Sequence, residues 1–173
     1  MQINSESRIG YPKKVVYEAY RDNLCEVVGL ISDIREVVVK SRDQTPEGVR
    51  IHNLWVADRE VPRVLSGVLR PDMMCWDDHA VWHDEHGYCE WRLTIPAFPN
   101  QVRCSGRNTF IEDGAGTRVI LTGDLDIDLA NIPGVPRLLA RRLKPQVEGL
   151  IVRLITPNLK RVNEALGDYL DQR

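Results

Sequence analysis

The last forty residues of the chain carry an apolar pattern with the period of a helix, and this pattern constrains the fold of everything before it. Apolar side chains recur at three- and four-residue steps between Pro133 and Leu170, which places them on one face of an α-helix. Pro145 suits a first helical turn, and Pro157 predicts a kink. The apolar stripe consists of Val147, Leu150, Ile151, Leu154, Ile155, Val162 and Leu166. A helix with so long a stripe needs a broad apolar surface to lie on.

The preceding hundred residues supply such a surface, because their apolar side chains alternate with period two. Strands are predicted at residues 2–9, 34–40, 49–57, 74–82, 88–95, 102–111 and 117–129. Two short helices, one opening at Pro12 and one spanning 24–31, separate the first two strands, and residues 59–72 predict a flap or short helix at a rim. Short, turn-rich connections between the strands predict antiparallel neighbours. The pattern therefore predicts an α+β fold, a curved antiparallel seven-stranded sheet wrapped around a long C-terminal helix.

Length and charge narrow the class of protein. A chain of 173 residues with a net charge of -2 fits a single domain over residues 1–173, with no global attraction to nucleic acid. No apolar run approaches the length of a membrane span, and the first residues lack a basic and apolar leader, which predicts a cytoplasmic protein. One basic cluster, Arg137, Arg141 and Arg142, predicts either a solvated helix face or a transient contact with a membrane surface. The sequence does not identify protein partners.

The cysteines and histidines do not predict a metal site. Four cysteines lie far apart without a CxxC pair, and we expect them to be buried small hydrophobic residues, with a zinc site as the weaker alternative. His79 and His83 share the strand face assigned to solvent, together with Asp77, but four residues span about 13 Å of extended strand. We therefore expect no metal and no cofactor.

Alternation also sorts the two faces of the predicted sheet. The inward face is apolar and aromatic, with polar exceptions at Asn53, Asp78 and Asn108. A ligand cavity combines apolar walls with a few placed polar groups. The side chains expected to line one are Asn53, Trp55, Trp76, Asp78, Trp82, Trp91, Cys104 and Asn108 from the strands, and Leu150, Leu154 and Asn158 from the long helix. The alternative is that the polar residues bond one another, backbone or water and serve only the fold.

The order strand, two short helices, six strands and long helix, with the opening Tyr11-Pro12-Lys13-Lys14-Val15-Val16-Tyr17 of the first helix, resembles a known architecture. It is similar to the helix-grip fold of the START-like (SRPBCC) superfamily, which includes birch-pollen-allergen-like proteins, polyketide cyclases and coenzyme-Q-binding proteins. The resemblance covers essentially the full length as one START-like domain. It implies a cavity for an apolar ligand between the sheet and the long helix.

Three functions are compatible with these features. The favoured one is binding of a small hydrophobic or aromatic molecule, in transport or sequestration. The alternative is a cyclase- or hydrolase-type enzyme that uses Asp78 as acid or base, since burial among tryptophans raises the pKa of a carboxyl group. No serine, cysteine or histidine forms a recognisable triad with it, which favours the role without catalysis. A third hypothesis is a partner-binding carrier whose rim flap and basic helix matter more than its interior.

Overall fold

The computed structural model describes residues 1–58, 70, 74–131, 140, 144–145 and 161–173. Some of the sequence predictions fall outside the described residues. They are most of the rim flap at 59–72, the kink at Pro157, the expected cavity residues Leu150, Leu154 and Asn158, and the basic cluster Arg137, Arg141 and Arg142.

The described residues form one antiparallel sheet of seven strands in the order β1-β7-β6-β5-β4-β3-β2. The strands are β1 (Gln2–Ile9), β2 (Ile34–Thr45), β3 (Gly48–Ala57), β4 (Cys75–His83), β5 (Tyr88–Thr94), β6 (Val102–Asp113) and β7 (Gly116–Ile127). Two helices, α1 (Lys13–Asp22) and α2 (Leu24–Val28), follow β1, and a short 3-10 helix, η3 (Leu129–Asn131), follows β7. A helix over residues 161–171 ends the chain. The predicted order of seven strands, two short helices and a final helix is confirmed, whereas η3, which begins within the strand predicted to end at residue 129, was not predicted.

Tight turns join β2 to β3, β4 to β5 and β6 to β7, and the last two of these turns each contain a glycine with positive φ. Gly87 between β4 and β5 has φ 67°, and Gly114 between β6 and β7 has φ 63°. Side chains with a β-carbon rarely adopt this left-handed conformation, so glycine is the residue that closes each hairpin.

Most predicted boundaries agree with the structure to within two residues, and two differ by more. β2 continues to Thr45 rather than ending at residue 40, because its second half lies at the sheet edge and is exposed on both faces, so no apolar alternation marks it. α2 stops at Val28 rather than reaching residue 31, since Gly29 follows directly and glycine weakens a helix.

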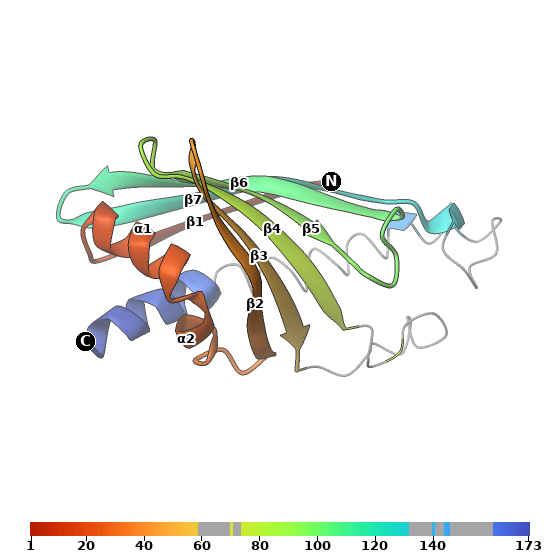
Figure 1. Cartoon of the computed structure of the whole chain (residues 1–173), viewed down its shortest axis with the longest axis horizontal. Helices are drawn as coiled ribbons and strands as arrows, with labels where there is room; N and C mark the ends of the chain where they lie inside the picture. The colour runs from red at the N-terminus through yellow and green to blue at the C-terminus, as the bar shows by residue number, and fades with distance from the viewer. Residues whose placement is uncertain (59–69, 71–73, 132–139, 141–143, 146–160) are drawn as a thin grey trace.

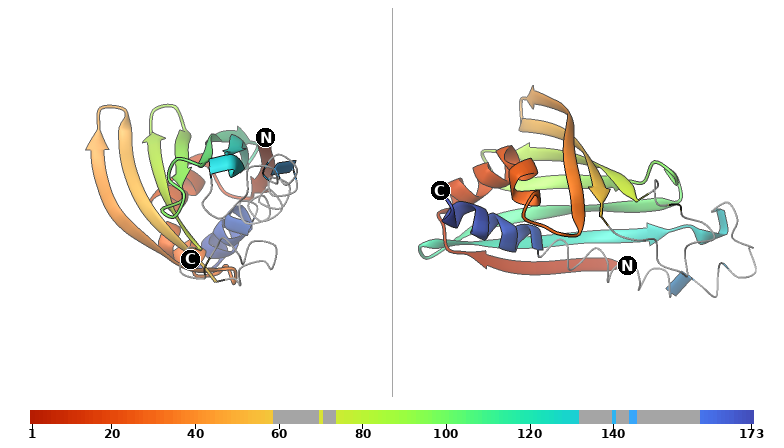
Figure 2. Two further views of the ribbon diagram at one scale, coloured as in Figure 1. Left: turned by 90° about the vertical axis from the view of Figure 1, so that its right-hand side faces the viewer. Right: turned by 90° about the horizontal axis from the view of Figure 1, so that it is seen from below.

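The helices lie on the concave side of the curved sheet (Figures 1 and 2). The C-terminal helix is held there by the Asn163 amide, which donates a hydrogen bond of 3.1 Å to Ser7 Oγ on β1, and by the Tyr169 hydroxyl, which donates one of 2.5 Å to Glu26 on α2. Val162 and Leu166 on this helix are buried, as the apolar stripe predicts. Within the part of the chain that the structure describes, no helix has the length and apolar character needed to cross a membrane.

The described core side chains gather in two clusters on this concave side. The larger one joins α1, α2 and the C-terminal helix to the sheet and includes Trp55, Trp82 and Phe110. The second covers β1, β6 and β7 and includes Trp91 and Leu125. Burial of these surfaces, at about 25 cal/mol per Å² of apolar area, holds the helices against the sheet.

The expectation that all four cysteines are buried is wrong in part. Cys89 and Cys104 are buried on the concave face, but Cys25 is exposed and Cys75 is half-buried. α2 directs Leu24 and Val27 inward, which places Cys25 on its solvent side.

Candidate functional site on the concave face

The tryptophans lie on the concave side of the sheet, as alternation predicts. Trp55, Trp82 and Trp91 are buried, and the half-buried Trp76 packs against the larger cluster. The Trp55 and Trp76 rings are stacked, with centroids 5.6 Å apart and planes 16° apart. The two indoles form an aromatic wall, in which Trp55 is buried and Trp76 is partly accessible.

Asp78 lies beside this wall, on the strand face that is otherwise apolar. It is the register partner of Asn53 on β3 and of Leu93 on β5. Trp55 Nε1 donates a hydrogen bond of 3.4 Å to Asp78 Oδ2, and the Asn53 amide is hydrogen-bonded to the same carboxyl group. The other oxygen, Oδ1, is buried and has no hydrogen-bond partner among the described residues. One acceptor on the concave face is therefore unused.

Burial changes the acidity of this carboxyl group. Removal from water raises the pKa of Asp78 from 3.8 to about 6, although the hydrogen bonds from Trp55 and Asn53 and the charge of His52 act in the opposite direction. The increase is the one expected from the sequence. A carboxyl group with this pKa can hold or release a proton near neutral pH, which is a requirement for acid–base chemistry.

A second polar group on the concave face centres on Asn108. Trp91 Nε1 donates a hydrogen bond of 3.0 Å to Asn108 Oδ1, and the Asn108 amide is also hydrogen-bonded to the Tyr20 hydroxyl. Tyr20 comes from the buried face of α1, and burial raises its pKa well above the ordinary value. The neighbouring Cys89 thiol also has a strongly raised pKa because it is buried. Both groups are therefore neutral at physiological pH.

Tyr20 is a polar group on the concave side that the sequence analysis missed. Its ring belongs to the apolar face of α1, so periodicity marks it only as a core residue. The available signal was chemical, since a buried tyrosine hydroxyl requires a hydrogen-bond partner, and Asn108 was one of two inward amides without an assigned partner.

The indole of Trp91 occupies space left by two glycines. Trp91 pairs in register with Gly106 on β6, which pairs in turn with Gly123 on β7. A β-carbon added at Gly106 would lie 2.4 Å from Trp91 Cζ2, and one added at Gly123 would lie 2.9 Å from Trp91 Cη2. The ring therefore lies across both glycines, at positions where neither strand carries a side chain.

The expected strand residues are thus brought to one face, but their expected role as ligand contacts stays a prediction. Asn53, Asp78 and Asn108 have protein partners, in agreement with the fold-only alternative for the two asparagines. Cys104 is buried in the second cluster, where burial raises its pKa to about 11. Of the expected strand residues that the structure describes, only Asp78 retains a buried polar atom without a partner.

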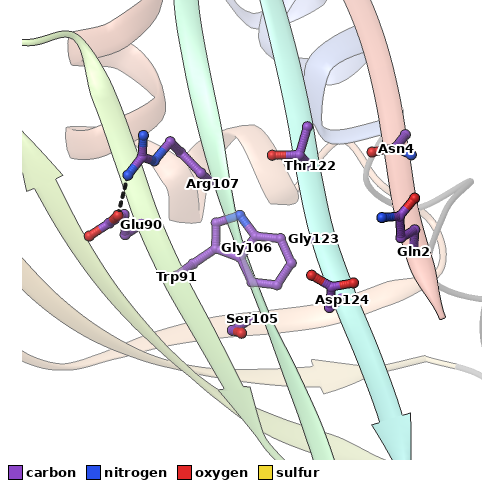
Figure 3. A pocket seen from close by; sticks show the side chains of 10 residues that line it. All are labelled: Gln2, Asn4, Glu90, Trp91, Ser105, Gly106, Arg107, Thr122, Gly123 and Asp124. Atoms are coloured by element: carbon purple, nitrogen blue, oxygen red, sulfur yellow. Dashed lines mark hydrogen bonds and ion pairs between the residues drawn. The ribbon is translucent and has the colours of Figure 1, made fainter.

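The opposite, convex face holds open hollows with polar walls. One of about 540 Å³ lies beside Gly106, Gly123 and Asp124, where Arg107 forms a hydrogen bond of 2.5 Å with Glu90 (Figure 3). Another of about 410 Å³ is lined by His52 and His79, among others. These side chains face solvent on a continuous strand surface, which is the ordinary exterior of an antiparallel sheet.

The histidines on the convex face form a local pair. His52 Nε2 lies 2.6 Å from Asp77 Oδ1, and the His52 and His79 rings are stacked with centroids 4.3 Å apart. Burial, with the charges of His52 and Arg92, lowers the pKa of His79. Among the residues that the structure describes, no group of three or more potential ligands could hold a metal ion.

Solved structures match this architecture over nearly the whole chain. TTHA0849 from Thermus thermophilus is 22% identical with a TM-score of 0.68, covering 96% of this chain and 97% of that one. Norcoclaurine synthase from Thalictrum flavum, in complex with dopamine and hydroxybenzaldehyde, is 12% identical with a TM-score of 0.65, covering 100% and 87%. Zhui aromatase/cyclase from Streptomyces sp. R1128 is 16% identical with a TM-score of 0.64, covering 95% and 93%.

No family model matches the sequence, and comparison with curated proteins gives no match either. The structural likeness identifies the fold. The chain has the helix-grip α+β fold of the START-like (SRPBCC) superfamily, as the sequence predicts.

Proposed function

We propose that the protein binds a small hydrophobic or aromatic molecule against the concave face of the sheet, in transport or sequestration. The observation that carries this proposal is the unused acceptor Oδ1 of Asp78, placed beside the partly accessible indole of Trp76. Leaving a buried polar atom unpaired costs about 1–3 kcal/mol, and a ligand that supplies a donor removes this cost. An apolar, aromatic wall with one placed polar group is typical of small-molecule sites.

The comparisons support the size and chemistry of such a ligand. One protein of the same fold is an aromatase/cyclase, and another is seen in complex with dopamine and hydroxybenzaldehyde. Both names concern aromatic chemistry, which agrees with the tryptophan-rich concave face.

A thermal-shift and native mass-spectrometry screen against lipids, quinones and polyketides tests the proposal. We expect at least one class to raise the melting temperature and to add its mass to the folded protein, because a ligand that binds only the native state stabilises it. Trp76→Ala should weaken this effect, whereas His79→Ala on the convex face should leave it unchanged. Absence of stabilisation and of mass addition for every class would contradict the proposal.

A cyclase- or hydrolase-type enzyme is the second candidate, favoured by the pKa of about 6 at Asp78. In this function Asp78 would act as acid or base on a bound substrate, while the neutral Tyr20 and Asn108 groups could orient a carbonyl oxygen. Asp78→Asn should then abolish turnover of a poly-β-ketone substrate and leave its binding largely intact. Turnover that persists in Asp78→Asn would exclude this role, while the binding function would stand.

A further inference from the structure

The two oxygens of the Asp78 carboxyl group differ in their hydrogen bonds to the protein. Oδ2 receives the hydrogen bond from Trp55 Nε1, and the Asn53 amide is hydrogen-bonded to the same group, but Oδ1 is buried with no donor among the described residues. Within the same part of the chain, no lysine, arginine or histidine forms an ion pair with Asp78. The charge of His52 acts on Asp78 only through the sheet, because the His52 ring is hydrogen-bonded to Asp77 on the opposite face. Among the described residues, an ionised Asp78 therefore has no counter-ion.

The other titratable groups around Asp78 on the concave side do not supply a charge. Tyr20 and Cys89 would each interact with the charge of Asp78, but burial keeps both protonated and neutral. Cys104, on the same face, is also kept neutral by burial. The described concave face therefore presents a single ionisable group that changes its charge near neutral pH, and its charged form is negative.

The surroundings of the carboxyl group suit an organic cation. The stacked indoles of Trp55 and Trp76 lie on the same strand face, and Trp76 is the partly accessible one. The face of an indole attracts a cation through its quadrupole, most strongly where water is excluded. A hydrogen bond between a charged donor and a carboxylate is about twice as strong as one between neutral groups.

We propose that the ligand is a hydrophobic amine, whose protonated nitrogen donates a hydrogen bond to Asp78 Oδ1 while its apolar body packs against Trp76. This inference rests on the proposed function, because it specifies the ligand class of the same site. A neutral hydroxyl would fill the acceptor but leave the carboxylate charge unbalanced. A carboxylic acid would place two like charges side by side. The alcohol and the acid should therefore both bind more weakly than the amine.

Four probes of one shape test the proposal: 4-phenylbutylamine, 4-phenylbutanol, 4-phenylbutyric acid and butylbenzene. Dissociation constants are measured at pH 7.5 by quenching of tryptophan fluorescence and checked by equilibrium dialysis with the full chain. We expect the amine to bind at least about tenfold more tightly than the alcohol and the hydrocarbon, and the acid to bind most weakly.

Asp78→Asn and Asp77→Asn form a matched pair of variants, since they neutralise adjacent carboxyl groups on opposite faces of β4. Asp78→Asn should lose about tenfold or more in affinity for the amine and change less than about twofold for butylbenzene. Asp77→Asn should bind all probes like the parent protein.

The outcomes separate the two proposals. If butylbenzene and the alcohol bind as tightly as the amine, or if Asp78→Asn retains the affinity for the amine, the amine proposal is wrong and the hydrophobic site remains. If none of the four probes binds and the wider screen also fails, the binding function itself is wrong, and the amine proposal with it.

Discussion

Gly106→Ala is expected to lower the free energy of unfolding by about 3 kcal/mol, although the change adds only one methyl group. A β-carbon at this position would lie 2.2 Å from the Thr122 carbonyl oxygen and 2.4 Å from Trp91 Cζ2. The first of these atoms belongs to the backbone of β7 and the second to a buried ring, so neither can withdraw without breaking strand pairing or core packing. Urea unfolding followed by circular dichroism measures the change.

Gly10→Ala is the control for the loss of glycine flexibility. No heavy atom lies within 4 Å of the β-carbon position there, so this variant changes the backbone flexibility without a steric clash. We expect its unfolding free energy to stay within about 0.5 kcal/mol of the parent. A Gly106→Ala protein as stable as the Gly10→Ala protein would show that Trp91 does not lie across the glycine pair.

Asp78→Asn is expected to stabilise the protein by up to about 3 kcal/mol at pH 8, the energy that corresponds to a pKa raised from 3.8 to about 6. Because this pKa is raised by folding, the native state binds the proton more tightly than the unfolded chain. The parent protein therefore loses stability as the pH rises through this range, in contrast to a carboxylate whose pKa is lowered by an ion pair. The advantage of the variant should shrink to about 1 kcal/mol at about pH 4.5.

Denaturant unfolding of the two proteins at several pH values measures this difference directly. Asp77→Asn serves again as the control, because it neutralises a carboxyl group on the solvent side of β4. There Asp77 is hydrogen-bonded to His52. A stability difference between the parent and Asp78→Asn that does not change with pH would show that burial does not raise the pKa of Asp78.

Much of the sheet could be predicted because one of its faces is buried. In β6 and β7 the alternation is regular, and the apolar inward side chains, such as Val102, Phe110, Val119 and Ile127, lie on the predicted face. A shift by one residue would turn the whole apolar set to solvent, so the pattern determines the facing strongly. β2 lacks this constraint in its second half, and its end was missed there.

The partners of the polar groups could not be predicted in the same way. Alternation shows that Asn108 faces inward. Whether Asn108 accepts a hydrogen bond from Trp91 depends on how far the indole extends across the neighbouring strands. That reach exists because Gly106 and Gly123 happen to be register partners, and register is a property of the assembled sheet. The exposed position of Cys25 likewise could not be predicted. It depends on how α2 is rotated about its axis, and a helix of five residues is too short for its apolar pattern to define that rotation.

The pairing of the first strand with the last has a consequence for biosynthesis. β1 and β7 are neighbours in the sheet, and their register joins Ile9 to Thr117 and Gln2 to Asp124. At about 5–20 residues per second, a ribosome needs roughly 5–20 s to make the intervening segment. During that interval the backbone groups of β1 cannot pair with β7. The sheet can form its β1–β7 pairing only after β7 has been made, and until then the unpaired β1 is open to pairing with other chains.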